Sequence, residues 1–280
     1  MKKLALTLSV VVVVFSLFLA WLEFWPGEKS SIISKTPLTS DQDEPVASNL
    51  YQYDSSIPTD AVSPDTTNTP TPQKSPNSKS LPTLDLSDAE IGLAAAELVG
   101  QSYFSKLFVP KSLIRHFVVT IDNLPTAKVP YKRLFITPAK GAFLVTPINQ
   151  NQFVIDSRNE ERYSPYIQVI NSIDLDKLVN LYIAYYPLFQ QAYEELGYTN
   201  RQFHDRLISV MEHLLATPSV ERPFSLTQPK VLYTFANEDL ESLSAGQKLL
   251  LRIGDKNRQT VLKALEQAVA LLRTFDSKNL

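Results

Sequence analysis

DRLISVMEHLLATP, residues 205–218, decides the fold class of this 280-residue chain, because its apolar residues recur at the spacing of an amphipathic helix. At about 100° per residue, this stretch and the residues just before it divide into an apolar and a polar face. Thr217 and Pro218 end the pattern, as breaker residues commonly end a helix. We therefore expect a helix over residues 200–216 with one side buried. The apolar face is formed by Phe203, His204, Leu207, Val210, Met211, Leu214 and Leu215.

The segments on either side of this helix predict a mainly α, compact helical domain with one small β-hairpin. Helices are expected where apolar residues recur every three to four positions between capping residues and breakers. The expected helices cover residues 87–100, 103–108, 110–124, 165–173, 175–196 with a kink at Pro187, 199–216, 244–254 and 257–275. Capping boxes are expected at Ser87 with Glu90, Thr199 with Gln202, and Ser244 with Gln247. The hairpin is expected to pair residues 133–137 with residues 142–146 around a turn at Gly141.

Residues 4–22 (LALTLSVVVVVFSLFLAWL) form an uncharged apolar run before the expected domain. At about 1.5 Å per residue, this run spans the hydrocarbon core of a bilayer. It fits either a retained single-pass anchor or a cleaved secretory signal. The length of the run and the lack of a small-x-small cleavage site favour the anchor, so residues 1–25 are expected to form a transmembrane signal-anchor helix. Lys2 and Lys3 predict a cytoplasmic amino terminus, with the rest of the chain across the membrane.

The composition changes abruptly after the apolar run. Residues 26–82 are rich in Pro, Ser and Thr and carry too little apolar surface to offset backbone entropy, which predicts a disordered linker. Residues 83–276 have the size of one globular domain. Residues 83–280 carry 21 Lys and Arg against 21 Asp and Glu, and a neutral domain with interspersed charges indicates neither nucleic acid nor an anionic bilayer as a partner.

Candidate functional side chains occupy the polar face of the 200–216 helix. His213 lies one turn from Ser209 and two turns from Arg206, so these side chains could line one edge of a cleft, although a mixed-charge face equally fits plain solvent exposure. Asp122 and Asn123 could orient a ligand or could simply end a helix before a proline. The candidate binding residues are Arg115, Asp122, Asn123, Asp205, Arg206, Ser209 and His213.

The pattern assigns no catalytic residue and predicts neither a metal site nor a cofactor. A helical metal site needs ligands three or four residues apart, whereas Glu212 and His213 are adjacent and diverge by about 100°. Neither a glycine-rich phosphate loop nor a Gly-x-Ser-x-Gly motif occurs, and the lack of cysteine excludes thiolate ligands. An aromatic stripe has the spacing of core packing, although aromatic platforms also bind sugars or peptides. The stripe comprises Tyr182, Tyr186, Phe189 and Tyr193.

Five segments of the expected domain carry a family resemblance. They are LDLSDAEI (84–91), RHFVVTIDNLP (115–125), YPLFQQAYEELGY (186–198), DRLISVMEHLLATP (205–218) and RPFSLTQPKVLYTFANEDLESLSAGQKLLLRIG (222–254). With these segments the chain resembles a family of Gram-negative envelope proteins, the domain-of-unknown-function family DUF 3014. The resemblance implies an envelope location but no activity. With the apolar run, it indicates a single-pass protein of the bacterial inner membrane whose carboxyl-terminal domain is periplasmic.

Two functional hypotheses follow. The favoured one is a non-enzymatic binding or scaffold module of the cell envelope, held to the membrane by residues 4–22, with an envelope protein or a cell-wall component as its partner. The alternative is an envelope hydrolase or a small-ligand-binding protein that uses the face formed by Asp205, Arg206 and His213.

Overall fold

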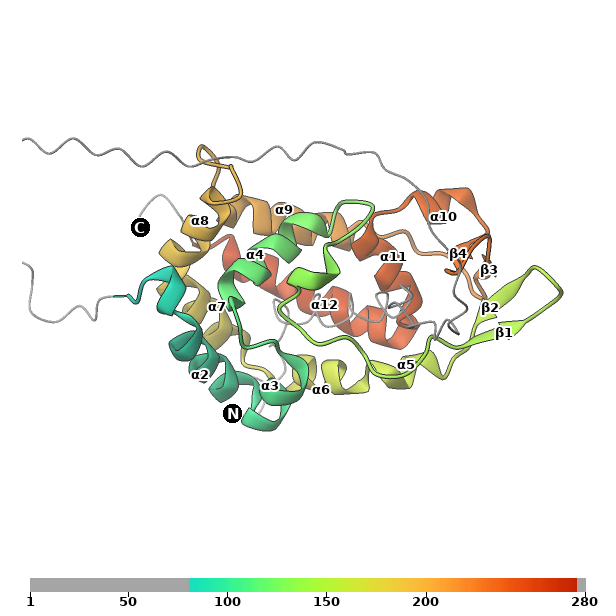
Figure 1. Ribbon diagram of the computed structural model, residues 1–280, viewed down its shortest axis with the longest axis horizontal. Helices are drawn as coiled ribbons and strands as arrows, with labels where there is room; N and C mark the ends of the chain where they lie inside the picture. The colour runs from blue at the N-terminus through green and yellow to red at the C-terminus, as the bar shows by residue number, and fades with distance from the viewer. Residues whose placement is uncertain (1–80, 276–280) are drawn as a thin grey trace, which may run out of the picture. The chain divides into compact units, whose positions relative to one another are not determined.

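The computed structural model of the chain describes residues 81–275, which form a mainly helical domain (Figure 1). Local sequence accounts for several helix ends. The Asp174 side chain accepts a hydrogen bond from the Lys177 backbone N–H at the start of one helix, and Ser244 with Gln247 forms a complete capping box at the start of another. Gly100 ends a helix with a φ of 88°, which glycine adopts without steric cost.

The described residues contain eleven α-helices and two short 3₁₀ turns. The α-helices are α2 (Asp88–Val99), α3 (Gln101–Leu107), α4 (Leu113–Asn123), α5 (Asn159–Arg162), α6 (Ser164–Ser172), α7 (Leu175–Ala184), α8 (Tyr186–Glu194), α9 (Phe203–Leu215), α10 (Glu238–Ser242), α11 (Ala245–Arg252) and α12 (Asp255–Leu272). The 3₁₀ turns are η2 (Leu84–Leu86) and η3 (Tyr131–Arg133).

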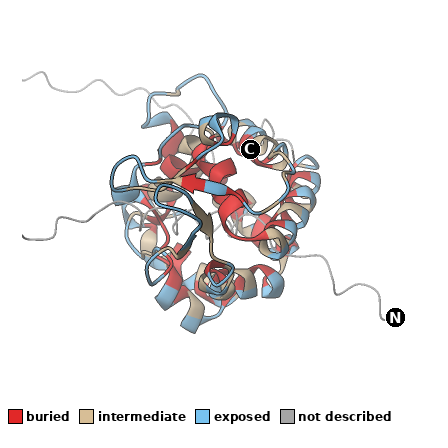
Figure 2. Ribbon diagram, turned by 90° about the vertical axis from the view of Figure 1, so that its right-hand side faces the viewer, coloured by how far each residue is buried: buried red, intermediate tan, exposed pale blue. Residues whose placement is uncertain are grey.

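Helix α12 lies in the middle of the domain, where α6, α7 and α9 pack against it (Figure 1). Its side chains Val261, Leu265 and Leu272 are fully buried. Helix α4 forms a second packing centre with α2, α8 and α9. In the turned view, buried positions line the inner sides of the helices and exposed positions the outer sides (Figure 2). Because each buried leucine contributes about 1.5–3 kcal/mol, this core holds α4, α8 and α9 firmly together.

A small antiparallel sheet is attached to the helical part. Its strands, in spatial order, are β1 (Val145–Pro147), β2 (Phe153–Ile155), β3 (Ser225–Thr227) and β4 (Thr234–Phe235). Strands β2 and β3 are distant in sequence and pair Phe153 with Leu226. A separate apolar cluster packs with the sheet and comprises Phe224, Leu226, Phe235, Leu240 and Leu251. Since Leu251 belongs to α11, this cluster joins the sheet to the helices.

The expected β-hairpin is wrong in position. Residues 131–133 form η3, and Ile136 makes only an isolated bridge with Phe108. The hairpin instead joins β1 to β2 and extends into a sheet of four strands. The physical reason lies in Leu134, Phe135 and Ile136, which are all buried in the main helical core. Three successive buried residues leave no polar face for an alternating strand to expose.

Three local expectations about the helices also differ from the structure. The expected kinked helix over residues 175–196 is two helices, α7 and α8, because the chain breaks at Tyr185 and Pro187 occupies the first turn of the second one. The expected capping box at Ser87 is absent, since its hydroxyl donates to the backbone carbonyl of Leu84. The expected capping box of Thr199 with Gln202 is also absent, because α9 begins only at Phe203 and the Gln202 side chain accepts a hydrogen bond from the Tyr186 hydroxyl.

The expected anchor over residues 4–22 and residues 26–80 of the expected linker lie outside the described residues. Within residues 81–275, no helix combines the length and the apolarity that crossing a membrane requires. The amino-terminal anchor therefore stays a prediction from the sequence.

Candidate functional site

Asp122, at the end of α4, is the centre of a polar cluster between three segments. Its Oδ1 atom accepts a hydrogen bond from Arg206 Nε on α9 at 2.8 Å, and its backbone carbonyl accepts another from Arg206 Nη2 at 2.7 Å. Its Oδ2 atom accepts a hydrogen bond from the Tyr198 hydroxyl at 3.1 Å, and the negative charge of Asp122 raises the pKa of this tyrosine. The cluster fastens α4 to α9 and to the connection that precedes α9, so Asp122 and Arg206 act as interhelical ties.

The neighbouring candidates do not join this cluster. Asn123 donates its side-chain N–H to the backbone carbonyl of Val119, one turn earlier in α4. Asp205 and Ser209 are exposed on α9. Of the candidates on the polar face of α9, only Arg206 contacts Asp122. The structure therefore brings Asp122 and Arg206 together and leaves Asp205 and Ser209 facing solvent.

His213, near the end of α9, contacts the start of α11. Its Nε2 atom lies 2.9 Å from Ser244 Oγ, and its backbone carbonyl accepts a hydrogen bond from the Gln247 side chain at 3.2 Å. Burial, with a smaller contribution from Arg206, lowers the pKa of His213 below 6.5, so the ring is neutral near pH 7. Ser244 Oγ also accepts the Gln247 backbone N–H in the capping box. Ser244 is 7 % exposed and its hydroxyl caps a helix, so this hydroxyl is poorly placed to attack a substrate.

Arg115, a half-buried residue of α4, makes its contacts elsewhere. Its guanidinium donates to both carboxylate oxygens of Glu195, at 2.7 and 3.2 Å, and lies 2.7 Å from Asp85. The hydrogen bond that Arg115 donates is the main reason that the pKa of the Glu195 carboxylate is lowered. Arg115 therefore holds η2 and the end of α8 against α4, and it shares no contact with Asp205 or His213.

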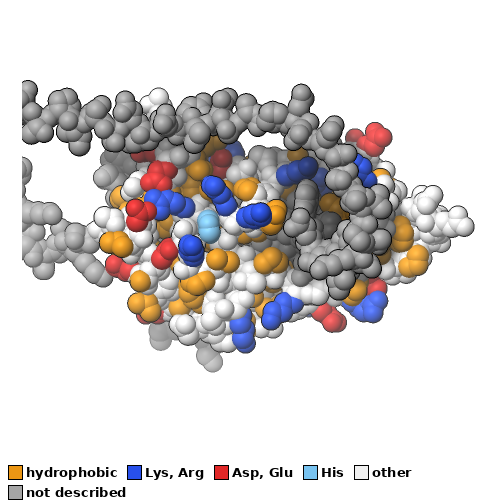
Figure 3. All heavy atoms as spheres, viewed as in Figure 1, with side chains coloured by type: hydrophobic (Ala, Val, Ile, Leu, Met, Phe, Trp, Pro, Cys, Tyr) orange, Lys and Arg blue, Asp and Glu red, His pale blue; other side chains and the backbone are white. Residues whose placement is uncertain are grey.

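A polar hollow of about 320 Å³ opens beside Arg115, between α4, the end of α8 and η3. Its polar side includes His116 and Arg133, which sequence reasoning did not single out, and its apolar side includes Val119, Ala192 and Leu196. Figure 3 shows Lys and Arg side chains gathered around a histidine over α4. The signal that could have found this hollow is local charge. Residues 101–141 carry seven Lys and Arg residues but only one acidic residue, Asp122.

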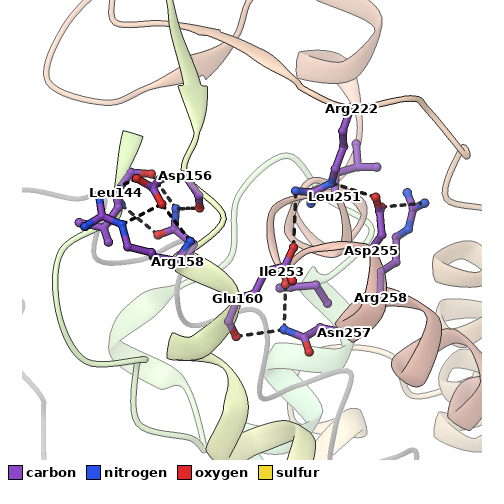
Figure 4. A network of polar contacts seen from close by, with 11 residues as sticks. Leu144, Asp156, Arg158, Glu160, Arg222, Leu251, Ile253, Asp255, Asn257 and Arg258 are labelled. Carbon is purple, nitrogen blue, oxygen red and sulfur yellow. Dashed lines mark hydrogen bonds and ion pairs between the residues drawn. The ribbon is translucent and has the colours of Figure 1, made fainter. Parts of the chain in front are cut away.

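A second polar network, also missed from the sequence, lies where the sheet region meets α5 and α12 (Figure 4). Arg222 donates to the backbone carbonyl of Leu251 at 2.7 Å and pairs with Asp255 at 3.3 Å. Asp255 also pairs with Arg258, one turn along α12, at 3.3 Å. Asn257 donates to the backbone carbonyls of Glu160 and Ile253. These contacts clamp segments that are distant in sequence, and we assign them a structural role.

The structure also shows where the remaining histidine and the aromatic stripe lie, and whether metal ligands gather. His204 is 3 % exposed and lies 3.1 Å from the Leu272 carbonyl oxygen, which agrees with its assignment to the apolar face of α9. In the expected aromatic stripe, Tyr182, Tyr186 and Tyr193 are buried in the main core. Among residues 81–275, no three His, Asp or Glu side chains gather in an arrangement that could hold a metal ion.

The fold and these contacts define a mainly helical domain with a small appended antiparallel sheet, whose polar clusters tie helices together and whose α4 face carries a basic hollow. The chain belongs to the family described as "Protein of unknown function (DUF3014)", which matches residues 113–268. The match runs from the start of α4 into α12 and confirms the resemblance drawn from the sequence. Neither the curated proteins nor the solved structures gave a match to the chain.

Proposed function

We propose that this protein is a non-enzymatic binding module of the cell envelope. In this proposal residues 4–22 are a retained single-pass anchor in the bacterial inner membrane, residues 26–82 are a spacer, and the helical domain binds another envelope component in the periplasm. The length of the Pro-rich spacer supports a tethered binding domain, because a long tether lets a domain search a volume around its anchor.

One observation supports a binding function rather than a catalytic one. The polar side chains best suited to chemistry are engaged in holding helices together: Asp122 with Arg206, Arg115 with Glu195, and His213 with Ser244. Catalysis needs a nucleophile or base, an orienting group and a reacting atom within a few ångströms of one another. These three pairs lie at three different contacts: α4 with α9, α4 with the end of α8, and α9 with the start of α11.

The alternative function, an envelope hydrolase or a small-ligand-binding protein that uses Asp205, Arg206 and His213, rests on the 2.9 Å contact between His213 and Ser244. A neutral histidine beside a hydroxyl is half of a nucleophile–base pair. No carboxylate within residues 81–275 makes a hydrogen bond to this histidine, and Ser244 is buried. The substitution His213→Ala separates the two functions, because a hydrolase loses its activity in cells while a binding module keeps it.

Proximity crosslinking in living cells tests the proposed function. The full chain carries the labelling group, and a matched control chain keeps residues 1–82 but lacks the domain. We expect the full chain to recover a defined envelope component that the control does not recover. If both chains recover the same abundant neighbours, the domain binds no partner and the proposal is wrong.

A further inference from the structure

Residues 101–141 carry an excess of positive charge, although the domain as a whole is neutral. The cations of residues 101–141 are Lys106, Lys111, Arg115, Lys128, Lys132, Arg133 and Lys140. The single acidic residue in this range, Asp122, is paired with Arg206. Figure 3 shows this face with several Lys and Arg side chains around the histidine over α4. The overall balance of the domain therefore conceals a local excess of positive charge in this range.

The acidic groups near the hollow already have partners. Glu195, which itself lines the hollow, and Asp85 both bind Arg115, which fixes this guanidinium at one wall. Asp88 accepts the backbone N–H groups of Ser112 and Leu113, at 2.6 and 2.8 Å, and so satisfies the first turn of α4. Neither arrangement neutralises the remaining cations.

Three basic side chains keep unused donor capacity. Within residues 81–275, Lys111 and Arg133 have no carboxylate in ion-pair distance, and both are exposed. The His116 ring makes no hydrogen bond to these residues, and its Nδ1 atom is buried. Because the His116 residue lines the hollow, an anion bound there can accept a hydrogen bond from a ring N–H.

We propose that the hollow lined by Arg115, His116 and Arg133 binds a phosphate group. The planar guanidinium of Arg133 suits two oxygens of one phosphate, the His116 ring supplies a further donor, and Lys111 adds a point charge nearby. The volume of about 320 Å³ exceeds what one phosphate fills and matches the small end of ligand pockets. Val119, Ala192 and Leu196 provide an apolar wall for the organic part of the ligand.

This inference rests on the proposed binding function and specifies a ligand that carries a phosphate group. The phosphate could belong to a small phosphate ester or to a lipid headgroup, since both present the same oxygens. Either source is an anion whose binding depends on Arg133, and the two sources differ in whether an acyl chain is needed.

The charges around His116 predict how binding depends on pH. Burial lowers the pKa of His116, as do the nearby charges of Arg133 and Lys111, whereas Asp88 raises it. A bound anion raises this pKa again, because it stabilises the imidazolium. By linkage, protonation of His116 must then strengthen anion binding, so binding of an anion of constant charge tightens as the pH falls.

Titration calorimetry of the full chain in a neutral detergent tests the site, with inorganic phosphate and a short-chain phosphatidic acid as probes. The site variant is Arg133→Gln, and the matched control is Lys230→Gln, which removes one exposed cation between β3 and β4. We expect Arg133→Gln to weaken binding about tenfold or more and Lys230→Gln to leave it unchanged. Circular dichroism establishes that both variants are folded.

Each outcome of the titration supports or overturns the phosphate site. Binding of inorganic phosphate that depends on Arg133 supports a free phosphate ligand, and binding of phosphatidic acid alone that depends on Arg133 supports a lipid headgroup. Absence of binding by both probes, or equal binding by the two variants, overturns the proposal. With sulfate as a probe of constant charge, binding should tighten between about pH 7.5 and about pH 5.5, and His116→Gln should abolish that change. A partner recovered by crosslinking would stand even if phosphate binding failed.

Discussion

Replacing Asp122 by alanine tests whether this residue is a tie between helices or a functional group. The change removes the 2.8 Å hydrogen bond with Arg206 Nε and the 3.1 Å hydrogen bond from Tyr198, while the contact of Arg206 with the backbone carbonyl of residue 122 survives. A hydrogen bond to a charged group contributes about 1.5–3 kcal/mol and a weaker one about 0.5–1.5 kcal/mol. The Arg206 side chain is 30 % exposed, so solvent reduces its share.

We therefore expect Asp122→Ala to lower the free energy of unfolding by about 2–3 kcal/mol, which corresponds to a fall in Tm of about 4–12 °C for a domain of this size. The matched control is Asp205→Ala, an exposed acidic residue on the same helix as Arg206, which should cost no more than about 0.5 kcal/mol. Thermal unfolding of the full chain, followed by its helical circular dichroism, measures both. Equal Tm values for the two variants would refute the assignment of Asp122 as an interhelical tie.

Two further predictions concern packing and pH. A Cβ atom on Gly246 would lie 2.5 Å from a methyl group of the buried Leu214, so Gly246→Ala should destabilise the domain by about 1–3 kcal/mol in the same assay, whereas Gly92→Ala, with no contact closer than 3.5 Å, should be neutral or stabilising. Burial is the largest cause of the lowered pKa values of His116 and His213, so below pH 6.5 the unfolded chain takes up protons that the folded chain does not, and stability should fall as the pH drops until the folded pKa values are passed.

The controls for these predictions are specific. A Tm for Gly246→Ala at or above that of Gly92→Ala would show that α11 and α9 are not as close as the structure places them. For the pH dependence, the double variant His116→Gln and His213→Gln should flatten the loss of stability below about pH 6.5. A loss of the same steepness in this variant would assign the effect to other groups.

The sequence predicted the helical elements well because their signals are local. The apolar face of α9 and the capping box of Ser244 with Gln247 depend on residues within a few positions of one another, and both occur as expected. The sheet could not be placed in this way. The pairing of Phe153 with Leu226 joins segments that are far apart in the chain, and no local pattern specifies such a pair. The run Leu134–Ile136 has strand-like composition, yet its burial among helices overrides that preference.

In the candidate site, too, local features could be predicted from the sequence and contacts between distant segments could not. Helical spacing correctly placed Asp205 and Ser209 on an exposed face of α9, but it could not show that Asp122 of α4 reaches Arg206 of α9. The hollow beside α4 depends on side chains from α4, α8 and η3 that meet only in the folded chain. A count of charges in short windows would have indicated the basic face, whereas the overall balance of the domain concealed it.

The central claim is that the helical domain is anchored to the inner membrane and works on its outer side. Protease accessibility in spheroplasts tests this claim most directly. The full chain is exposed to protease before and after the spheroplasts are lysed. The account predicts that protease added to intact spheroplasts cleaves the chain within residues 26–82 and releases a fragment that contains the helical domain. If the chain is cleaved only after lysis, the domain lies in the cytoplasm and the proposed envelope function is contradicted.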